Sequence, residues 1–170
     1  MRSRSRRSLL GIVGIVGLVA AMLVAAGCSV HPGAAAVVDG RTISQSYLDR
    51  TYEEIGNPNL TKETTLLLLI VAPYVIEAAA GQGVGVSESE ARAGAQAGLA
   101  ASEVSAGTVE FYRTTASWQN LTNQPGGPEL IDEVIVGVLA KEIDINPRYG
   151  DLNLQTGLIA RAPLPWIVGG

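Results

Sequence analysis

Cysteine and histidine are almost absent from this chain of 170 residues, which contains one of each, Cys28 and His31. A lone cysteine cannot form a disulfide within the chain. A serine or cysteine triad needs a histidine base, and a zinc site needs three or four cysteine and histidine ligands. The composition therefore excludes both kinds of site, and we expect no metal and no other cofactor.

Basic residues are scarce beyond the first seven positions. Four of the twelve Lys and Arg residues lie in that leader, so eight remain from residue 28 onward against sixteen Asp and Glu, a net charge near −8. Nucleic acids and anionic lipid headgroups are bound by clustered Lys and Arg. We therefore expect no nucleic-acid partner, and we attribute the acidic excess to solubility.

Carboxylates occur in three close pairs along the chain. They are Glu53 with Glu54, Glu88 with Glu90, and Asp132 with Glu133. Such pairs serve glycoside hydrolysis or calcium binding in other proteins. Each pair here falls on a predicted solvent face or in a first helical turn, where the helix dipole favours acids. We expect all three pairs to be solvated, and we predict that the chain is not an enzyme.

The first 28 residues are typical of an export signal. Arginines precede an uncharged apolar run from Leu9 to Ala26, and Cys28 follows shortly after it. The segment Val24–Cys28 resembles the lipobox of bacterial lipoproteins, with Ala25 where that family usually has leucine. The resemblance implies cleavage before Cys28 and attachment of diacylglycerol to its sulfur.

Two alternatives to a lipoprotein signal stay open. The apolar run of 18 residues reaches the roughly 17 to 25 that cross a bilayer, so it also fits an uncleaved anchor. An ordinary secretory signal that is cut elsewhere is the second alternative. The lipoprotein interpretation is favoured because the lone cysteine directly follows three small residues. It places the protein on the extracytoplasmic face of the cell membrane, anchored by lipid.

The chain divides into four parts. Residues 1–27 are the expected signal peptide, and residues 28–33 are a short polar tether that includes His31. Residues 34–150 predict one mainly α-helical domain of about five helices with a small two-stranded β element. Residues 151–170 predict a C-terminal tail of loop structure.

Capping residues and apolar spacing place the helices of the domain. The first is expected to open at Ile43–Ser46, with a serine as its cap, and to end at Gly56. The others are expected from Thr61 to Gly81, from Ser87 with a capping box at Glu90 to about Ala100, from Ser105 or Thr108 to Asn123, and from Pro128 to Leu139. The second helix is apolar on all sides from Leu66 to Ala72, so we expect it at the centre of the core. Pro73 should bend it near Leu69 and create a shallow concavity. The fifth helix has the clearest amphipathic stripe and should pack on the core.

Two short segments have the character of strands. Ala35 to Val38 is small and β-branched, and Ile143 to Ile145 alternates apolar and polar residues. Since each needs a partner and no other candidate is evident, we expect these two segments to pair.

Large aromatic side chains gather on the fourth helix, where Phe111 and Trp118 share one stripe and Tyr112 lies on the next. Such a stripe is typical of core packing, and it also fits a groove for apolar peptide. Tyr74, Tyr112 and Trp118 are the candidates for a groove of this kind near the bend at Pro73.

A series of short motifs runs along residues 34–146. It comprises Ala36-Val37-Val38-Asp39-Gly40, Leu69-Ile70 leading into an apolar helix, Gly83-Val84-Gly85-Val86-Ser87-Glu88-Ser89-Glu90, and a late amphipathic helix that ends in a strand. In this order the motifs resemble the N-terminal domain of SurA-type periplasmic chaperones, and residues 145–150 are similar to the ending of actinobacterial SurA-like lipoproteins. The resemblance implies a client-binding domain without the parvulin prolyl isomerase domain of the catalytic relatives.

We therefore expect a membrane-anchored envelope lipoprotein whose domain binds unfolded or extended polypeptide, as a chaperone-like module for secreted proteins. The alternative is an accessory or structural subunit that docks one dedicated envelope protein. Suppression of client aggregation would favour the first function. Co-purification of a single stoichiometric protein would favour the second.

Overall fold

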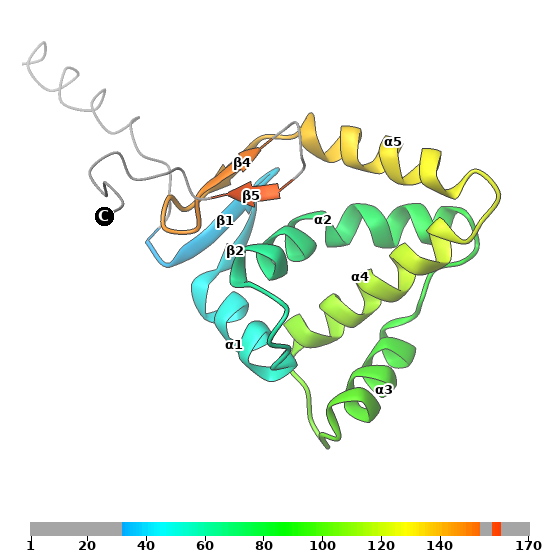
Figure 1. The fold of residues 1–170 in the computed structure, drawn as a ribbon, viewed down its shortest axis with the longest axis horizontal. Coiled ribbons are helices and arrows are strands. Elements are labelled where there is room, and N and C mark those ends of the chain that lie inside the picture. The colour runs from blue at the N-terminus through cyan, green and yellow to red at the C-terminus, as the bar shows by residue number, and fades with distance from the viewer. Residues whose placement is uncertain (1–31, 154–157, 161–170) are drawn as a thin grey trace, which may run out of the picture.

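The computed structural model describes residues 32–153 and 158–160 (Figure 1). Its elements are β1 (Ala34–Val38), β2 (Arg41–Ser44), α1 (Gln45–Ile55), α2 (Lys62–Gly81), α3 (Glu88–Leu99), α4 (Ala106–Thr122), α5 (Gly127–Leu139), β3 (Ile143–Ile145), β4 (Asp151–Asn153) and β5 (Leu158–Ala160). The prediction of a mainly α-helical fold with five helices and a small β element is confirmed. The signal segment, Cys28, His31 and residues 161–170 lie outside the described residues.

β1 lies in the middle of a three-stranded antiparallel sheet, between β2 and β3. Ala36 lies opposite Ile145, which confirms the predicted pairing of the first and last strand segments of the domain. The expected two-stranded element was one strand too small. Asp39 and Gly40, at φ of 49° and 79°, form a hairpin turn that lets β2 pair back on β1.

Each of the first four helices begins after a hydroxyl side chain that accepts a hydrogen bond from its first turn. These N-cap residues are Ser44, Thr61, Ser87 and Ser105. Glu90 completes the predicted capping box, because its carboxylate accepts from the Ser87 amide at 2.8 Å. Since Ser105 caps α4, the earlier of the two predicted starts is correct.

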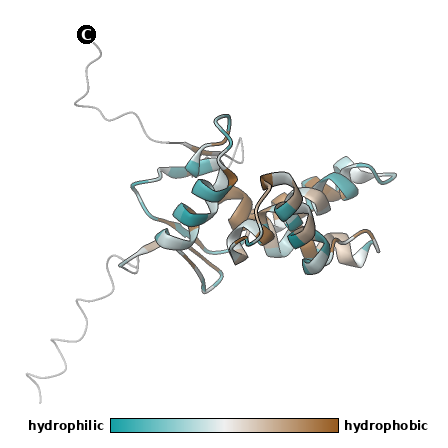
Figure 2. Cartoon of the chain, turned by 90° about the horizontal axis from the view of Figure 1, so that it is seen from below, coloured by the Kyte–Doolittle hydropathy of each residue, from teal (hydrophilic) through white to brown (hydrophobic). Residues whose placement is uncertain are grey.

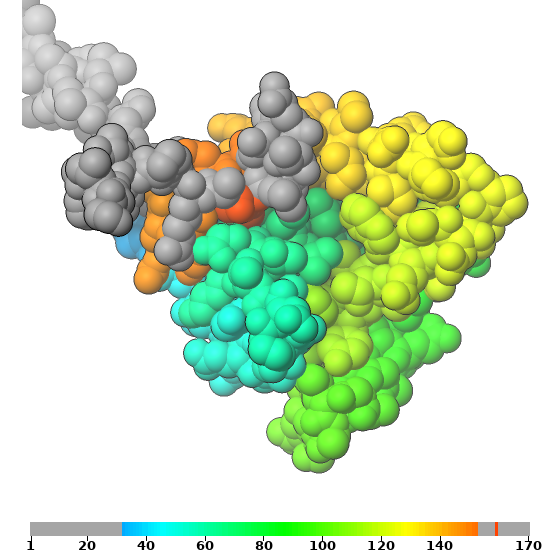
Figure 3. All heavy atoms as spheres, viewed as in Figure 1, coloured from blue at the N-terminus to red at the C-terminus, as the bar shows by residue number. Residues whose placement is uncertain are grey.

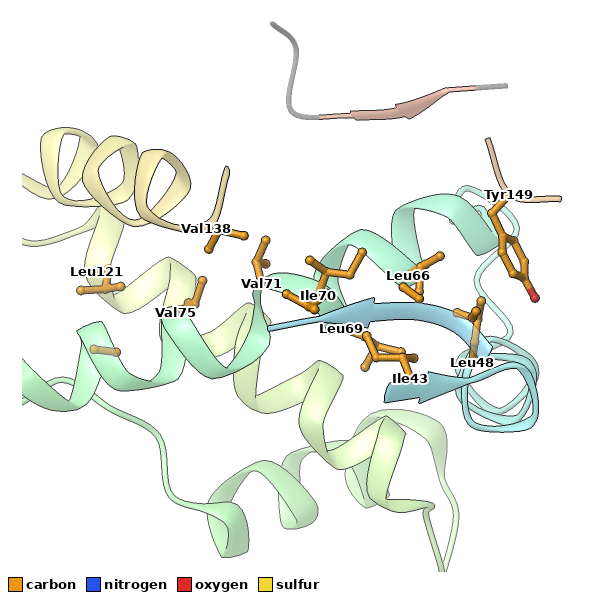
Figure 4. Packing of buried hydrophobic residues seen from close by; sticks show 14 residues of the cluster. Ile43, Leu48, Leu66, Leu69, Ile70, Val71, Val75, Leu121, Val138 and Tyr149 are labelled. Carbon is orange, nitrogen blue, oxygen red and sulfur yellow. The ribbon is translucent and has the colours of Figure 1, made fainter. Parts of the chain in front are cut away.

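α2 is the central helix of the domain, as predicted. Its Leu66, Leu69 and Ile70 are almost completely buried, and side chains from β2, α1, α4 and α5 surround that helix (Figure 4). Among the described helices only α2 is long and apolar enough to cross a membrane, and eight of its residues are buried inside the domain. In Figure 2 brown and teal residues alternate along single helices, in keeping with their amphipathic packing around this core.

α3 packs closely on α4 through small side chains. Ala91 and Ala95 are buried, and a methyl group on Gly98 would lie 2.9 Å from the Tyr112 hydroxyl oxygen. The small residues therefore let the two helices approach, as the sequence predicts. α3 forms the lower corner of the molecule and α5 its upper right edge (Figure 3).

β4 and β5 pair as an antiparallel hairpin, with Leu152 opposite Ile159. The prediction of a loop from residue 151 onward was therefore wrong for the described part of the tail. Two of the three residues of β4, Asp151 and Asn153, are of types that are depleted in strands, so the sequence does not indicate a strand there. Ile159 packs, partly buried, against the core, so tertiary contacts stabilise what local sequence does not indicate.

Candidate binding site

An apolar hollow of about 300 Å³ lies between α5 and the rest of the domain. Eleven of its twelve lining residues are apolar. They are Leu67, Leu68, Ile70 and Val71 of α2, Trp118 of α4, Ile131, Ile135, Val138 and Leu139 of α5, Ile143 of β3 and Leu152 of β4. The twelfth is Asp132. The hollow thus lies between α2 and four elements from the second half of the chain, α4, α5, β3 and β4.

The hollow forms because α5 packs most closely against the rest of the domain near its two ends. At its start, Gly127 fits against the backbone of Leu121 and Thr122, where a Cβ atom would overlap their carbonyl oxygens. Near its end, Val138 enters the core and points toward Val71 of α2 (Figure 4). Only Gly127 and Val138 of this helix are buried. The expected packing of α5 on the core therefore occurs, but its central apolar residues stay half-buried.

α2 supplies the floor of the hollow. Ile70 and Val71 are buried there, whereas Leu67 and Leu68 are half-buried and reach the wall. An amphipathic helix would carry polar residues at some of these positions. Because Leu67 and Leu68 are apolar as well, the side of the hollow that α2 forms is apolar throughout.

Asp132 is the only charged residue among the described residues that line the hollow. It is exposed to solvent although it lines the hollow, so its carboxylate lies at the rim. Glu129 and Glu133 are further exposed acids on α5, and none of the described residues that line the hollow is a lysine or an arginine. The rim is therefore negative.

The structure places the three predicted groove residues at three different sites, and all three are half-buried. Trp118 lines the hollow under α5. Tyr74 lines a separate, smaller depression beside β1 and Pro73. Tyr112 lies against Gly98 of α3 and makes an edge-to-face contact with Phe111, the ring centroids being 6.1 Å apart. Only Trp118 thus belongs to the hollow under α5.

The predicted concavity beside Pro73 is present as an open depression of about 540 Å³. Its wall holds a polar network in which Glu110 accepts from Arg41 and from the Tyr47 hydroxyl, each at 2.6 Å. Burial and the neighbouring Glu110 carboxylate raise the pKa of Tyr47 well above its ordinary value. Because these side chains bond one another, the network holds β2, α1 and α4 together and offers few free polar groups to a ligand.

The carboxylate pairs lie at the surface, as predicted. Glu53, Glu54, Glu88, Glu90, Asp132 and Glu133 are all exposed. Two of them have structural roles, since Glu90 completes the α3 capping box and Glu54 accepts hydrogen bonds at the start of α4. Within residues 32–153 and 158–160, no three Asp, Glu, His or Cys residues form a group that could hold a metal ion.

Sequence reasoning did not single out the leucines and isoleucines that form most of the hollow. A signal for them exists in the α2 sequence, where Leu67 and Leu68 continue the apolar run around the helix. Together with the apolar stripe of α5, this gives more apolar surface than the core covers. Their meeting at one hollow depends on the placement of α5, which no local pattern encodes.

No family model matches the chain, and neither the curated proteins nor the solved structures include a significant match to it. The resemblance to SurA-type N-terminal domains therefore stays a prediction.

Proposed function

We propose that the hollow under α5 binds extended apolar segments of polypeptides and that the protein is a chaperone-like module for secreted proteins. The observation that carries the proposal is the lining, in which eleven of twelve residues are apolar. Burial of apolar side chains there would remove hydrophobic surface from water, at roughly 25 cal/mol per Å². A volume near 300 Å³ is at the lower end for ligand pockets, so binding should be weak and readily reversible.

The proposal includes an anchor on the membrane. Lipid on Cys28 would hold the domain at the extracytoplasmic face, joined by a short tether to β1, which begins at Ala34. A domain at that position would meet polypeptides as they leave the membrane in an extended state.

The test uses residues 29–170, which contain every described helix, strand and core residue. We expect this protein to suppress light scattering from an unfolded, aggregating client at stoichiometric concentration. Leu68→Asp and Leu139→Asp should each abolish that suppression, because both side chains line the hollow. Both are half-buried and neither belongs to the core cluster or the side chains packed against it, so the fold should persist in circular dichroism.

Val136→Asp is the matched control. Val136 lies on the same helix as Leu139, is 67% exposed and does not line the hollow. It should leave suppression unchanged. Failure of the folded wild-type protein to suppress aggregation would contradict the proposed function. Co-purification of one stoichiometric envelope protein would then support an accessory subunit.

A further inference from the structure

Asp132 distinguishes the hollow from a purely apolar cavity. In the part of the chain that the structure describes, it is the only ionisable residue of the lining. Among residues 32–153 and 158–160 it forms no hydrogen bond or ion pair. An exposed carboxylate without a partner, directly beside apolar side chains, is free to pair with a cation on a bound ligand.

The charged residues of α5 all have one sign. α5 carries Glu129, Asp132 and Glu133 and no basic residue. On a helix surface Asp132 is the neighbour of Ile135, three residues on, which also lines the hollow. A ligand that fills the hollow with apolar side chains and brings a cation to its rim therefore gains an attraction that an anionic ligand lacks.

We propose that the hollow prefers extended polypeptide segments in which a lysine or arginine directly flanks the apolar residues, with Asp132 paired to that cation. This inference rests on the proposed function and names its substrate class. Exposed ion pairs are weak, so the preference for a basic over a neutral flank should be about 1.5-fold to 5-fold in Kd. Salt should reduce it, because exposed charges are screened.

The experiment compares three fluorescein-labelled peptides with one common apolar segment, followed by lysine, glutamine or glutamate. Binding to residues 29–170 is measured by fluorescence anisotropy. Wild-type protein should bind the lysine peptide most tightly and the glutamate peptide least tightly. Raising NaCl to about 1 M, where the Debye length is about 3 Å, should bring the three Kd values together.

Asp132→Asn should remove the preference and leave the binding of the glutamine peptide unchanged. Glu133→Gln is the matched control, because it removes the same charge from the next residue of α5, which is exposed and does not line the hollow. Glu133→Gln should keep the preference. Both positions are exposed, so neither substitution threatens the fold.

The outcomes separate this inference from the function on which it rests. Equal binding of the three peptides to wild-type protein would overturn the inference and leave polypeptide binding intact. A preference that survives Asp132→Asn also overturns it, because another carboxylate would then be responsible. If no peptide binds, polypeptide binding itself is wrong. A dimer that dissociates on Leu139→Asp, with no peptide bound, would assign the hollow to a second copy of the chain and overturn both.

Discussion

Arg41 donates a hydrogen bond to the backbone carbonyl oxygen of Leu69 at 3.2 Å. In an unbroken α-helix that oxygen would accept from the amide of residue 73, but Pro73 has no amide hydrogen. β2 therefore supplies the donor that α2 lacks. The same guanidinium pairs with Glu110 at 2.6 Å, so one side chain links β2, α2 and α4.

Arg41→Ala should lower the free energy of unfolding by about 1 to 3 kcal/mol, because it leaves the Leu69 carbonyl and the Glu110 carboxylate without this partner. Pro73→Ala restores an amide to residue 73. In the Pro73→Ala background, Arg41→Ala should lower the free energy of unfolding by about 1 kcal/mol less than it does in the wild-type background. Urea unfolding of the four proteins of this double-mutant cycle, followed by circular dichroism, measures the coupling.

Arg92→Ala is the control for the cycle. It removes an exposed pair with Glu88, four residues away on α3, and should change stability by less than about 0.5 kcal/mol in either background. If Arg41→Ala lowers the free energy of unfolding equally in the wild-type and Pro73→Ala backgrounds, Arg41 does not replace the missing helical donor.

Gly107 should tolerate no side chain. It is buried where α4 crosses α1, and a Cβ atom there would overlap the Thr51 hydroxyl and lie 3.2 Å from the Tyr47 ring. Gly107→Ala should therefore lower the free energy of unfolding by about 1 to 3 kcal/mol. Gly94→Ala on α3, with open space around the new atom, should raise it by up to about 1 kcal/mol.

Thermal unfolding of these glycine variants is the measurement. Adding Thr51→Ala to Gly107→Ala should recover part of the loss, because it removes the hydroxyl that the new methyl group meets. If the Gly107→Ala protein is as stable as the Gly94→Ala protein, α1 and α4 do not approach each other as closely as described.

Local signals predicted most of the fold. The hydroxyl caps and the capping box at Ser87 each depend on residues within a few positions of one another, and the structure contains all of them. β2 was not predicted although Asp39 and Gly40 are typical of a hairpin turn, and the assignment of Ile43 to the first helix was wrong, because Ile43 pairs with Ala36 in the sheet. The β4–β5 hairpin was not predicted because Asp151 and Asn153 are of types that are depleted in strands.

The candidate site was less predictable than the fold. Trp118 was singled out and lines the hollow, whereas Tyr74 and Tyr112 lie elsewhere. An aromatic residue in a sequence indicates a large apolar side chain. The sequence does not indicate which neighbouring element that side chain faces in the folded domain. The hollow exists because α5 is fixed at Gly127 and Val138 and covers α2 incompletely between them. That geometry results from tertiary packing over more than eighty residues.

The Glu54 carboxylate joins α1 to the start of α4. It accepts from the Ser105 amide at 2.9 Å and from the Thr108 hydroxyl at 2.6 Å. Partial burial opposes ionisation, but these hydrogen bonds and the charge of Arg50 outweigh it and hold the pKa of Glu54 below its ordinary value.

Acid should therefore weaken this link. A pKa lowered by folding contributes stability that is present above the unfolded pKa and is lost as the pH falls through the folded pKa. Glu54→Gln keeps an acceptor oxygen and loses the charge, so it should cost under about 1 kcal/mol at neutral pH. Urea unfolding at a series of pH values should show the difference from wild type shrinking as the pH falls below the ordinary glutamate pKa of about 4.3.

Glu53→Gln controls for the loss of one negative charge, since Glu53 is the exposed neighbour of Glu54 on α1. Its difference from wild type should not follow the same decline. If the two variants depend on pH in the same way, the hydrogen bonds to α4 are not the source of the effect.

Cys28 is the residue on which the proposed membrane anchor depends, and it lies outside the described residues. In a bacterium that produces the full chain, wild-type protein should incorporate labelled fatty acid and fractionate with membranes, because two acyl chains on one cysteine bind stably where a single chain is marginal. Cys28→Ser should lose the label, and His31→Ala, three residues away, should keep it. Membrane-bound protein without label and with its first 27 residues intact would identify an uncleaved anchor. Cleaved, unlabelled protein in the soluble fraction would identify an ordinary secretory signal, and the domain would then meet its clients free of the membrane.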